Sequence, residues 1–228
     1  MTHFLYLDIE TLPTTDAVVM AEIANSVTPP GSYKKAETIA EWERETKPGL
    51  VKEAIAKTSF SGAAGSVCCI GWAWGDDEPD SLTVGDEGRD EAAILRAMTL
   101  HLQETRPLGF EKPVVVGHYV AGFDIRFLWQ RAFVHGVLLP PWFPRDPKPW
   151  ADDIHDTMTM WGGKESISLD DLCKALLIPG KGNMTGADVA GMWERGEREA
   201  VAAYCRDDVR RVRAVHQRMM LAYGEVAA

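Results

Sequence analysis

The stretch Phe4-Leu-Tyr-Leu-Asp-Ile-Glu10 decides the fold class, because it is a nearly continuous apolar run that carries two acids. Apolar and β-forming residues dominate it, and Thr11-Leu-Pro13 ends it, which predicts a strand. Side chains alternate along a strand, so Asp8 and Glu10 point to the same face. The apolar residues on both sides of this pair indicate a central, buried position in a sheet.

The rest of the chain surrounds this strand with further strands and with helices. The other strands are expected at residues 66–74, 81–84, 113–117 and 154–161. Helices are expected at residues 90–103, 125–135, 168–177 and 194–223. This order of strands and helices is typical of an α/β fold.

Residues 14–64 have a different pattern. Asp16–Asn25 and Ala36–Glu45 carry apolar residues at helical intervals, and Pro29-Pro30-Gly31 separates them. We therefore expect a helical insertion at 14–64 within a single domain that spans residues 1–228.

Composition and charge narrow the possible functions. The net charge is −10 and the pI about 5.1, which argues against a protein that coats nucleic acid through a positive field. A nuclease remains possible, because a carboxylate site is acidic until cations bind. The chain has no run of about 18 apolar residues and no basic segment before its first strand, so we expect neither a membrane helix nor a secretory signal. The four cysteines lack zinc-type spacing and are interpreted as small buried residues in a reducing cytoplasm.

Asp8 and Glu10 allow two interpretations. A pair of carboxylates on a buried strand is costly unless the acids are solvated or bound to cations, which favours a metal site. The alternative is a pair of solvent-facing acids on a surface strand. The spacing by itself leaves both open.

Two further motifs carry acids at defined places. Asp124 ends the stretch Gly117–Asp124, which follows a predicted strand and opens a helix, where ligand sites of α/β sheets often lie. Alternatively, Asp124 is a helix N-terminal acid that the helix dipole favours. Tyr204 and Asp208 lie four residues apart and share a face of the last helix. Their alternative is a half-buried tyrosine beside a surface acid.

The three motifs occur along the chain in the order found in the DEDD superfamily of exonucleases, and together they resemble that superfamily. The third motif carries tyrosine, as in the tyrosine subclass, and the chain resembles most the free-standing proteins related to the proofreading domain of family B DNA polymerases. The resemblance covers nearly the whole chain and includes the segments 169–172, 175–181, 186–189 and 192–193. It implies a ribonuclease-H-like fold, with a mixed five-stranded sheet flanked by helices.

The resemblance also implies hydrolysis of phosphodiester bonds from 3′ ends with two divalent ions. Hard oxygen ligands suit Mg²⁺ or Mn²⁺. We expect Asp8, Glu10 and Asp208 to hold the ion next to the attacking water, with Asp8 also bridging to a second ion. Asp124 would position that second ion, and Tyr204 would orient the water.

The expected substrate is nucleic acid with a free 3′ end, taken as single-stranded DNA. The alternatives are a 3′–5′ exoribonuclease of the same superfamily and a catalytically silent nucleic-acid-binding module. A role in proofreading would require a separate polymerase or repair partner. One departure concerns Tyr119, because relatives often carry asparagine there.

Several aromatic and basic residues are candidates for substrate contact. The loop at 140–150 combines aromatic rings, which can stack on bases, with cations that can hold phosphates. The alternative is that the rings anchor the loop to the core, as Trp and Phe are usually buried. The candidates in the loop and in the second motif are Trp142, Phe143, Arg145, Lys148, Trp150, His118 and Phe123.

Overall fold

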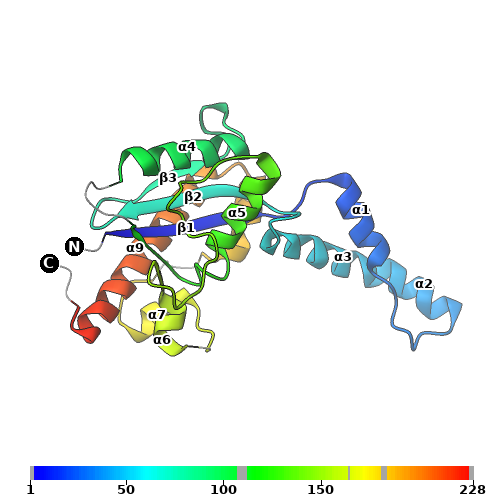
Figure 1. Ribbon diagram of the computed structural model, residues 1–228. Helices are drawn as coiled ribbons and strands as arrows, with labels where there is room; N and C mark the ends of the chain where they lie inside the picture. Colours follow the sequence, from blue (N-terminus) through cyan, green and yellow to red (C-terminus); the bar gives the residue numbers. More distant parts are fainter. Residues whose placement is uncertain (1–2, 107–111, 164, 181–183, 226–228) are drawn as a thin grey trace. The chain divides into compact units, whose positions relative to one another are not determined.

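The computed structural model describes residues 3–106, 112–163, 165–180 and 184–225. A mixed five-stranded sheet, in the order β3-β2-β1-β4-β5, is flanked by helices (Figure 1). The chain divides into two compact units, one of Met1–Glu10 with Val67–Ala228 and the other of Thr11–Ser66. The strands are β1 Phe4–Leu12, β2 Ser66–Trp74, β3 Asp80–Thr83, β4 Val114–Gly117 and β5 Ile154–Asp156. The predicted α/β fold is confirmed.

β1 lies in the middle of the sheet, as its apolar sequence predicts. It pairs in parallel with β4, with Phe4 opposite Val114 and Tyr6 opposite Val116. β4 pairs in parallel with β5, whereas β2 and β3 are antiparallel. This mixture follows from the chain connections, because a short turn joins β2 to β3 and helices precede β4 and β5.

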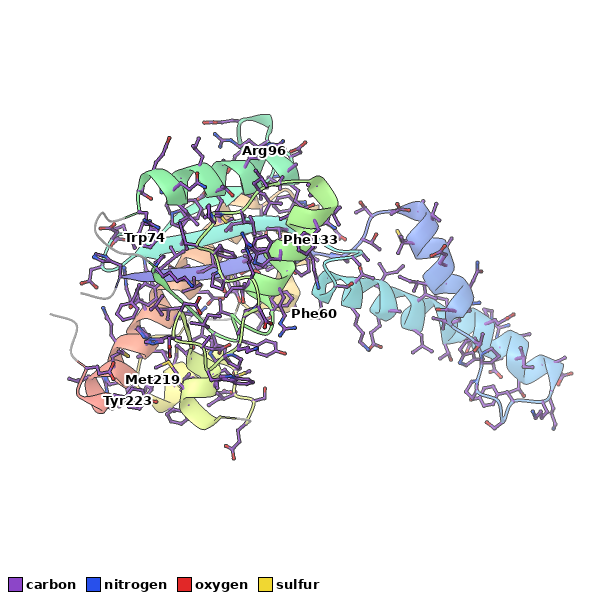
Figure 2. The ribbon with its side chains drawn as sticks, in the orientation of Figure 1. Phe60, Trp74, Arg96, Phe133, Met219 and Tyr223 are labelled. Atoms are coloured by element: carbon purple, nitrogen blue, oxygen red, sulfur yellow. The ribbon has the colours of Figure 1, made fainter. Side chains whose placement is uncertain are left out.

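The two faces of β1 are covered by different helices. Leu5, Leu7 and Ile9 belong to the large core cluster with α4 Glu91–Glu104 and α5 Asp124–His135. Tyr6 packs on the opposite face, against Val209 and Val212 of the long helix α9 Arg198–Tyr223. Asp8 and Glu10 share the face of Tyr6 by alternation, so α9 covers the face that carries the acids. Side chains fill this packed unit, among them Trp74 of β2 and Met219 of α9 (Figure 2).

Two predicted boundaries are wrong. The fifth strand was expected to run through residue 161, but it ends at Asp156, whose side chain accepts a hydrogen bond from Met158 N and begins α6 Thr157–Gly162. The last helix was expected from residue 194, but α8 Val189–Glu194 precedes α9, and Gly196, with a φ of 77°, lies between them. Glycine adopts this left-handed conformation without steric cost.

The shorter elements of this unit follow local capping rules. Ser168 accepts a hydrogen bond from Asp171 N and begins α7 Leu169–Ala175. The 3₁₀ turns are η2 Asp86–Gly88 and η3 Gly186–Asp188. Among the residues that the structure describes, no helix is long and apolar enough to cross a membrane.

The unit Thr11–Ser66 is helical. Asp16 caps α1 Ala17–Ser26, and α2 Ala36–Glu45 and α3 Lys47–Ala56 follow, with η1 Lys57–Phe60 at the end. The two predicted helices are present, whereas α3 was not expected. Pro48 stands in its first turn, a position where proline favours a helix, so it begins α3 instead of breaking it.

Candidate metal centre

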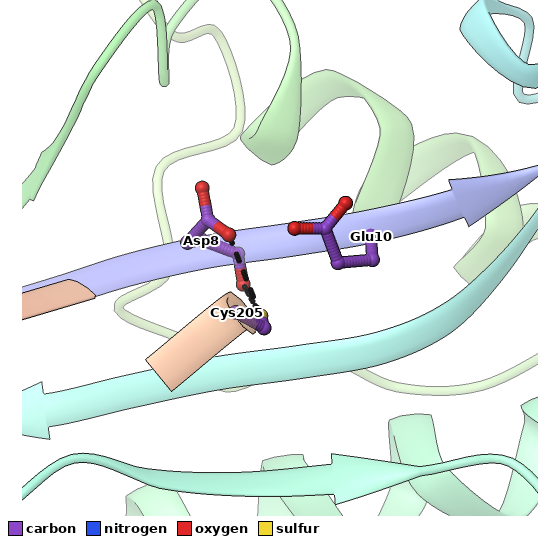
Figure 3. A group of neighbouring side chains, drawn as sticks. All are labelled: Asp8, Glu10 and Cys205. Carbon is purple, nitrogen blue, oxygen red and sulfur yellow. Dashed lines mark hydrogen bonds between the residues drawn. The ribbon is translucent and has the colours of Figure 1, made fainter. Parts of the chain in front are cut away.

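Asp8 and Glu10 lie together on β1, on the face that α9 covers. The Glu10 side chain is buried, and that of Asp8 is partly buried. One ligand atom each from Asp8, Glu10 and Cys205 lies within 4.8 Å of the others (Figure 3). Two carboxylates of β1 and a thiol of α9 therefore form a compact donor group.

The environment of Asp8 disfavours its negative charge. Burial raises the pKa of Asp8 well above its ordinary value, and the carboxylates of Glu10 and Asp124 raise it further. A hydrogen bond from Cys205 opposes this shift. A divalent cation would reverse the balance, because it compensates both the lost solvation and the repulsion among the acids. The donor set, which is rich in carboxylate oxygen, fits Mg²⁺ or Mn²⁺.

Asp124 is tied to the same point of β1. It is the first residue of α5, and it accepts a hydrogen bond of 3.1 Å from the backbone N–H of Ile9, which lies between Asp8 and Glu10. Burial raises the pKa of Asp124 to about 7, and the nearby Asp156 adds to the effect, while the hydrogen bonds that Asp124 accepts oppose it. The structure therefore brings the acids of the first and second motifs together.

Asp156 organises the turn that precedes Asp124, a role that the sequence analysis missed. Its buried carboxylate accepts hydrogen bonds from Tyr119 N at 2.9 Å and Ala121 N at 3.2 Å. Tyr119 has a φ of 61°, a left-handed conformation that asparagine adopts more readily than tyrosine. The departure from the resembled family therefore lies at a strained backbone position. The signal in the sequence was an acid directly before Thr157, a helix-capping pattern at the end of a strand.

The third motif reaches the same face from α9. Burial raises the pKa of the Tyr204 hydroxyl, and the carboxylates of Glu10 and Asp8 raise it further. Asp208 is buried and forms an ion pair with Arg211, which also binds Asp170 at 2.9 Å. Tyr204 is thus within electrostatic reach of the β1 acids, while Asp208 lies outside the 4.8 Å group in the described part of the chain.

Cys205 is the second residue that the sequence analysis missed. It is fully buried, as expected, but its thiol also donates to the Asp8 carboxylate at 3.4 Å and to the Asp8 backbone carbonyl at 3.5 Å. The available signal was its position on the helix, directly after Tyr204 and one turn before Asp208.

A comparison with known protein families shows the family to which the chain belongs. The model that describes predicted 3′–5′ exonucleases related to the exonuclease domain of PolB matches residues 65–228. The chain belongs to this family. The relation to the exonuclease domain of PolB, expected from the motifs, is thereby confirmed, and the reaction predicted for the family is 3′–5′ exonucleolysis.

The solved structures show the same fold. The family B DNA polymerase from the hyperthermophilic archaeon Pyrobaculum calidifontis is similar with a TM-score of 0.60 and 16% sequence identity. The similarity covers 98% of this chain and 25% of the polymerase, so the chain spans about a quarter of that protein's length. No curated protein matches the chain. The ribonuclease-H-like architecture predicted for this exonuclease-family member is confirmed.

The candidate substrate residues of the second motif are mostly engaged inside the protein. His118 Nδ1 lies 3.0 Å from the Thr157 hydroxyl, and Nε2 lies 2.8 Å from the carbonyl oxygen of Ile167. Phe123 is partly buried, with its ring centre 5.4 Å from that of Phe127. These contacts favour a role in holding the loop before Asp124.

The loop at 140–150 divides into a buried and an exposed part. Phe143 is 1% exposed and Trp142 packs against the core, with its ring centre 6.0 Å from that of Trp74. Trp150 is 76% exposed. Arg145 is exposed, and the exposed Lys148 forms an ion pair with Asp146 at 3.2 Å. The exposed part of the loop is the part that can meet a nucleic-acid strand.

Proposed function

We propose that this member of the exonuclease family hydrolyses the terminal phosphodiester bond at 3′ ends of single-stranded DNA with two divalent ions, Mg²⁺ or Mn²⁺. One observation carries the proposal: Asp8 and Glu10 lie together on β1, Asp124 accepts a hydrogen bond from Ile9 N between them, and the charges of Asp8 and Glu10 act on Tyr204. The match to the family model supports the reaction class.

Each residue of the site has a proposed task. Asp8, Glu10 and Asp208 would hold one ion, Asp8 and Asp124 would hold the second, and the ions would supply and activate the attacking water. When bound, such ions generate a hydroxide near neutral pH and stabilise the extra charge on the phosphate. The raised pKa of Tyr204 keeps its hydroxyl protonated, so Tyr204 orients the water by hydrogen bonding and does not act as the base.

Asp208 must leave Arg211 to take part. A guanidinium and a metal ion compete for the same carboxylate oxygens. Arg211 has a second acidic partner in Asp170, so it keeps a counter-charge when Asp208 turns toward an ion. The ion pair with Arg211 is thus compatible with a metal-binding role for Asp208.

The wider assignment rests on the resemblance. We propose that residues 1–228 act as one exonuclease domain in the cytoplasm, with the segment 14–64 as a helical insertion. A separate polymerase or repair protein would be the partner in any proofreading role.

Digestion of single-stranded oligonucleotides tests the function. A DNA strand labelled at its 5′ end should shorten stepwise in Mg²⁺ or Mn²⁺ and should remain intact with a chelator. A circular strand of the same sequence offers no 3′ end and should resist. Equal cutting of the circle would contradict the proposal, and faster digestion of an RNA strand would favour the exoribonuclease alternative.

A further inference from the structure

We propose that Cys205 adds a sulfur ligand to Asp8 and Glu10, so that this site also binds a thiophilic divalent ion, Zn²⁺ or Cd²⁺, which inhibits the hard-ion reaction. The inhibition rests on the proposed function, because it requires that Asp8 and Glu10 hold the reactive ions. The sulfur site itself rests on geometry alone.

The three donors already have the spacing of ligands to one ion. The Cys205 thiol lies 3.4 Å from Asp8 Oδ2, and the ligand atoms of Asp8, Glu10 and Cys205 are all within 4.8 Å of one another (Figure 3). In a tetrahedral zinc site, bonds of about 2.3 Å to sulfur and about 2.0–2.2 Å to oxygen place the two ligands roughly 3.5 Å apart. An ion can therefore bridge the thiol and the carboxylate with little movement of either.

Gly71 leaves room for the sulfur because it has no side chain. A Cβ atom added at Gly71 of β2 would lie 2.8 Å from the Cys205 sulfur and 3.3 Å from a methyl group of Val209. Any other residue at 71 would thus push the sulfur aside. The thiol also donates to the backbone carbonyl of Asp8, which orients it toward β1. The ligand is therefore pre-positioned by two strands and α9.

Ligand softness predicts which ions respond. A thiolate favours Zn²⁺ and other soft ions, whereas Mg²⁺ and Mn²⁺ favour oxygen ligands. Binding releases the thiol proton to solvent, because the thiolate is the ligand. An ion held by sulfur would occupy both oxygen donors of β1, so Asp8 could not bridge two hard ions at the same time.

Titration of the ion-free protein with Cd²⁺ tests the proposal, since a thiolate bound to Cd²⁺ absorbs in the ultraviolet. Wild-type protein should gain this absorption at one equivalent. Cys205→Ser and Cys205→Ala should lose it, and their affinity for Cd²⁺ should fall at least roughly 10- to 100-fold more than their affinity for Mn²⁺. A general loss of structure would lower both affinities together.

Two other cysteines provide controls. Cys173 lies in a separate apolar cluster with Leu172 and Val215, so Cys173→Ser should keep the absorption. Cys69 shares a hydrogen bond with Cys205, so its sulfur is also close to the site. Cys69→Ser should also keep the absorption, and its loss there, with retention in the Cys205 variants, would overturn the assignment.

The number of sulfur ligands can be measured on the wild-type protein. The proposal can therefore be tested even if the Cys205 variants do not fold. X-ray absorption at the cadmium edge should show one sulfur among oxygen ligands, and no sulfur or two sulfurs would contradict the proposal. Exonuclease activity in Mg²⁺ without a Cd²⁺–thiolate signal would refute this inference alone. A Cd²⁺–thiolate signal without any Mg²⁺-dependent cleavage would refute the proposed function and leave the sulfur site standing.

Discussion

Two polar clusters lie near opposite ends of the α9-facing side of β1, and they differ in charge. At one end, the Tyr6 hydroxyl lies 3.1 Å from His216 Nδ1, and His216 Nε2 lies 2.8 Å from His155 Nδ1. At the other end lie Asp8 and Glu10, and Asp124 accepts a hydrogen bond from the backbone N–H of Ile9 between them. The first cluster is neutral and bonds internally, whereas the second is a group of like charges.

This difference in charge distinguishes a cluster with a structural role from one that can bind a ligand. A buried polar cluster is tolerated when its members hydrogen-bond to one another, and it then needs no ligand. Burial raises the pKa of Asp8 and Asp124, and neighbouring carboxylates raise it further, so a bound cation would stabilise these acids. The cluster around Tyr6 is therefore stable without a ligand, whereas the cluster around Asp8 favours the binding of a cation.

Removal of an acid from the candidate metal site should have the largest effect on activity. Asp8→Ala or Asp208→Ala should abolish cleavage, because each removes a proposed metal ligand. Asp8→Ala should leave the melting temperature unchanged or raise it by about 2–4 °C, the change that roughly 1 kcal/mol produces in a protein of this size, since it relieves repulsion. Asp207→Ala is the matched control, because Asp207 is exposed and pairs with Arg210. Near-normal turnover by purified Asp8→Ala in Mg²⁺ would refute the site.

Tyr204 of α9 and Tyr6 of β1 test the same contrast, because a change to Phe removes only the hydroxyl from each. Tyr204→Phe should lower turnover about ten- to a hundredfold, the cost of one lost hydrogen bond of roughly 1–3 kcal/mol, with little change in KM. Tyr6→Phe should instead lower the free energy of unfolding and leave turnover unchanged, because its hydroxyl bonds to His216. Single-turnover kinetics and thermal melts of both variants provide the comparison. An unaffected rate for Tyr204→Phe would mean that its hydroxyl is idle.

The two clusters should respond to acid in opposite directions. Burial, together with the neighbouring His155, lowers the pKa of His216 to about 3 from 6.5, so the unfolded chain binds the proton first as the pH falls. The stability from neutral His216 is complete above pH 6.5 and is lost progressively below it, by about 2 kcal/mol at pH 5. Asp124 has a raised pKa, so its protonation below about pH 7 stabilises the folded state instead.

Single variants separate these opposing effects. Between pH 7 and pH 5, His216→Phe should gain stability relative to wild type, and Asp124→Asn should lose stability relative to wild type. Denaturant melts of the ion-free proteins at both pH values measure each difference. If both variants changed their stability relative to wild type in the same direction, the opposite responses expected of the two clusters would be refuted.

The smallest effect is expected in the loop at 140–150. This loop also combines buried side chains, which pack inside the protein, with exposed side chains that a ligand could contact. Arg145→Ala combined with Lys148→Ala should weaken binding of single-stranded DNA and reduce the slope of log affinity against log salt by up to about 1.4, with little change in melting temperature. The control is Phe143→Ala, which should destabilise the fold because Phe143 is buried. An unchanged salt slope for the double variant would place the substrate track elsewhere.

Local patterns in the sequence determined a large part of this protein. Alternation along β1 put Asp8 and Glu10 on one face, and the helical period put Tyr204 and Asp208 on another shared face. These periodicities depend only on residues that are close in sequence, so they can be predicted without knowledge of the tertiary structure. The order of the three motifs then led to the exonuclease family, which the family comparison confirms.

Only the tertiary structure decided which side chains from distant segments meet. Cys205 contacts Asp8 across 197 positions of the chain, and no local period relates the two. Asp156 likewise reaches the turn at Tyr119 from the next strand, so the acid that ended the predicted fifth strand early also holds the second motif. Such contacts depend on strand order and helix packing, which bring together residues whose sequence separation is arbitrary. The sulfur beside the acids and the internal bonds of His118 are both of this kind.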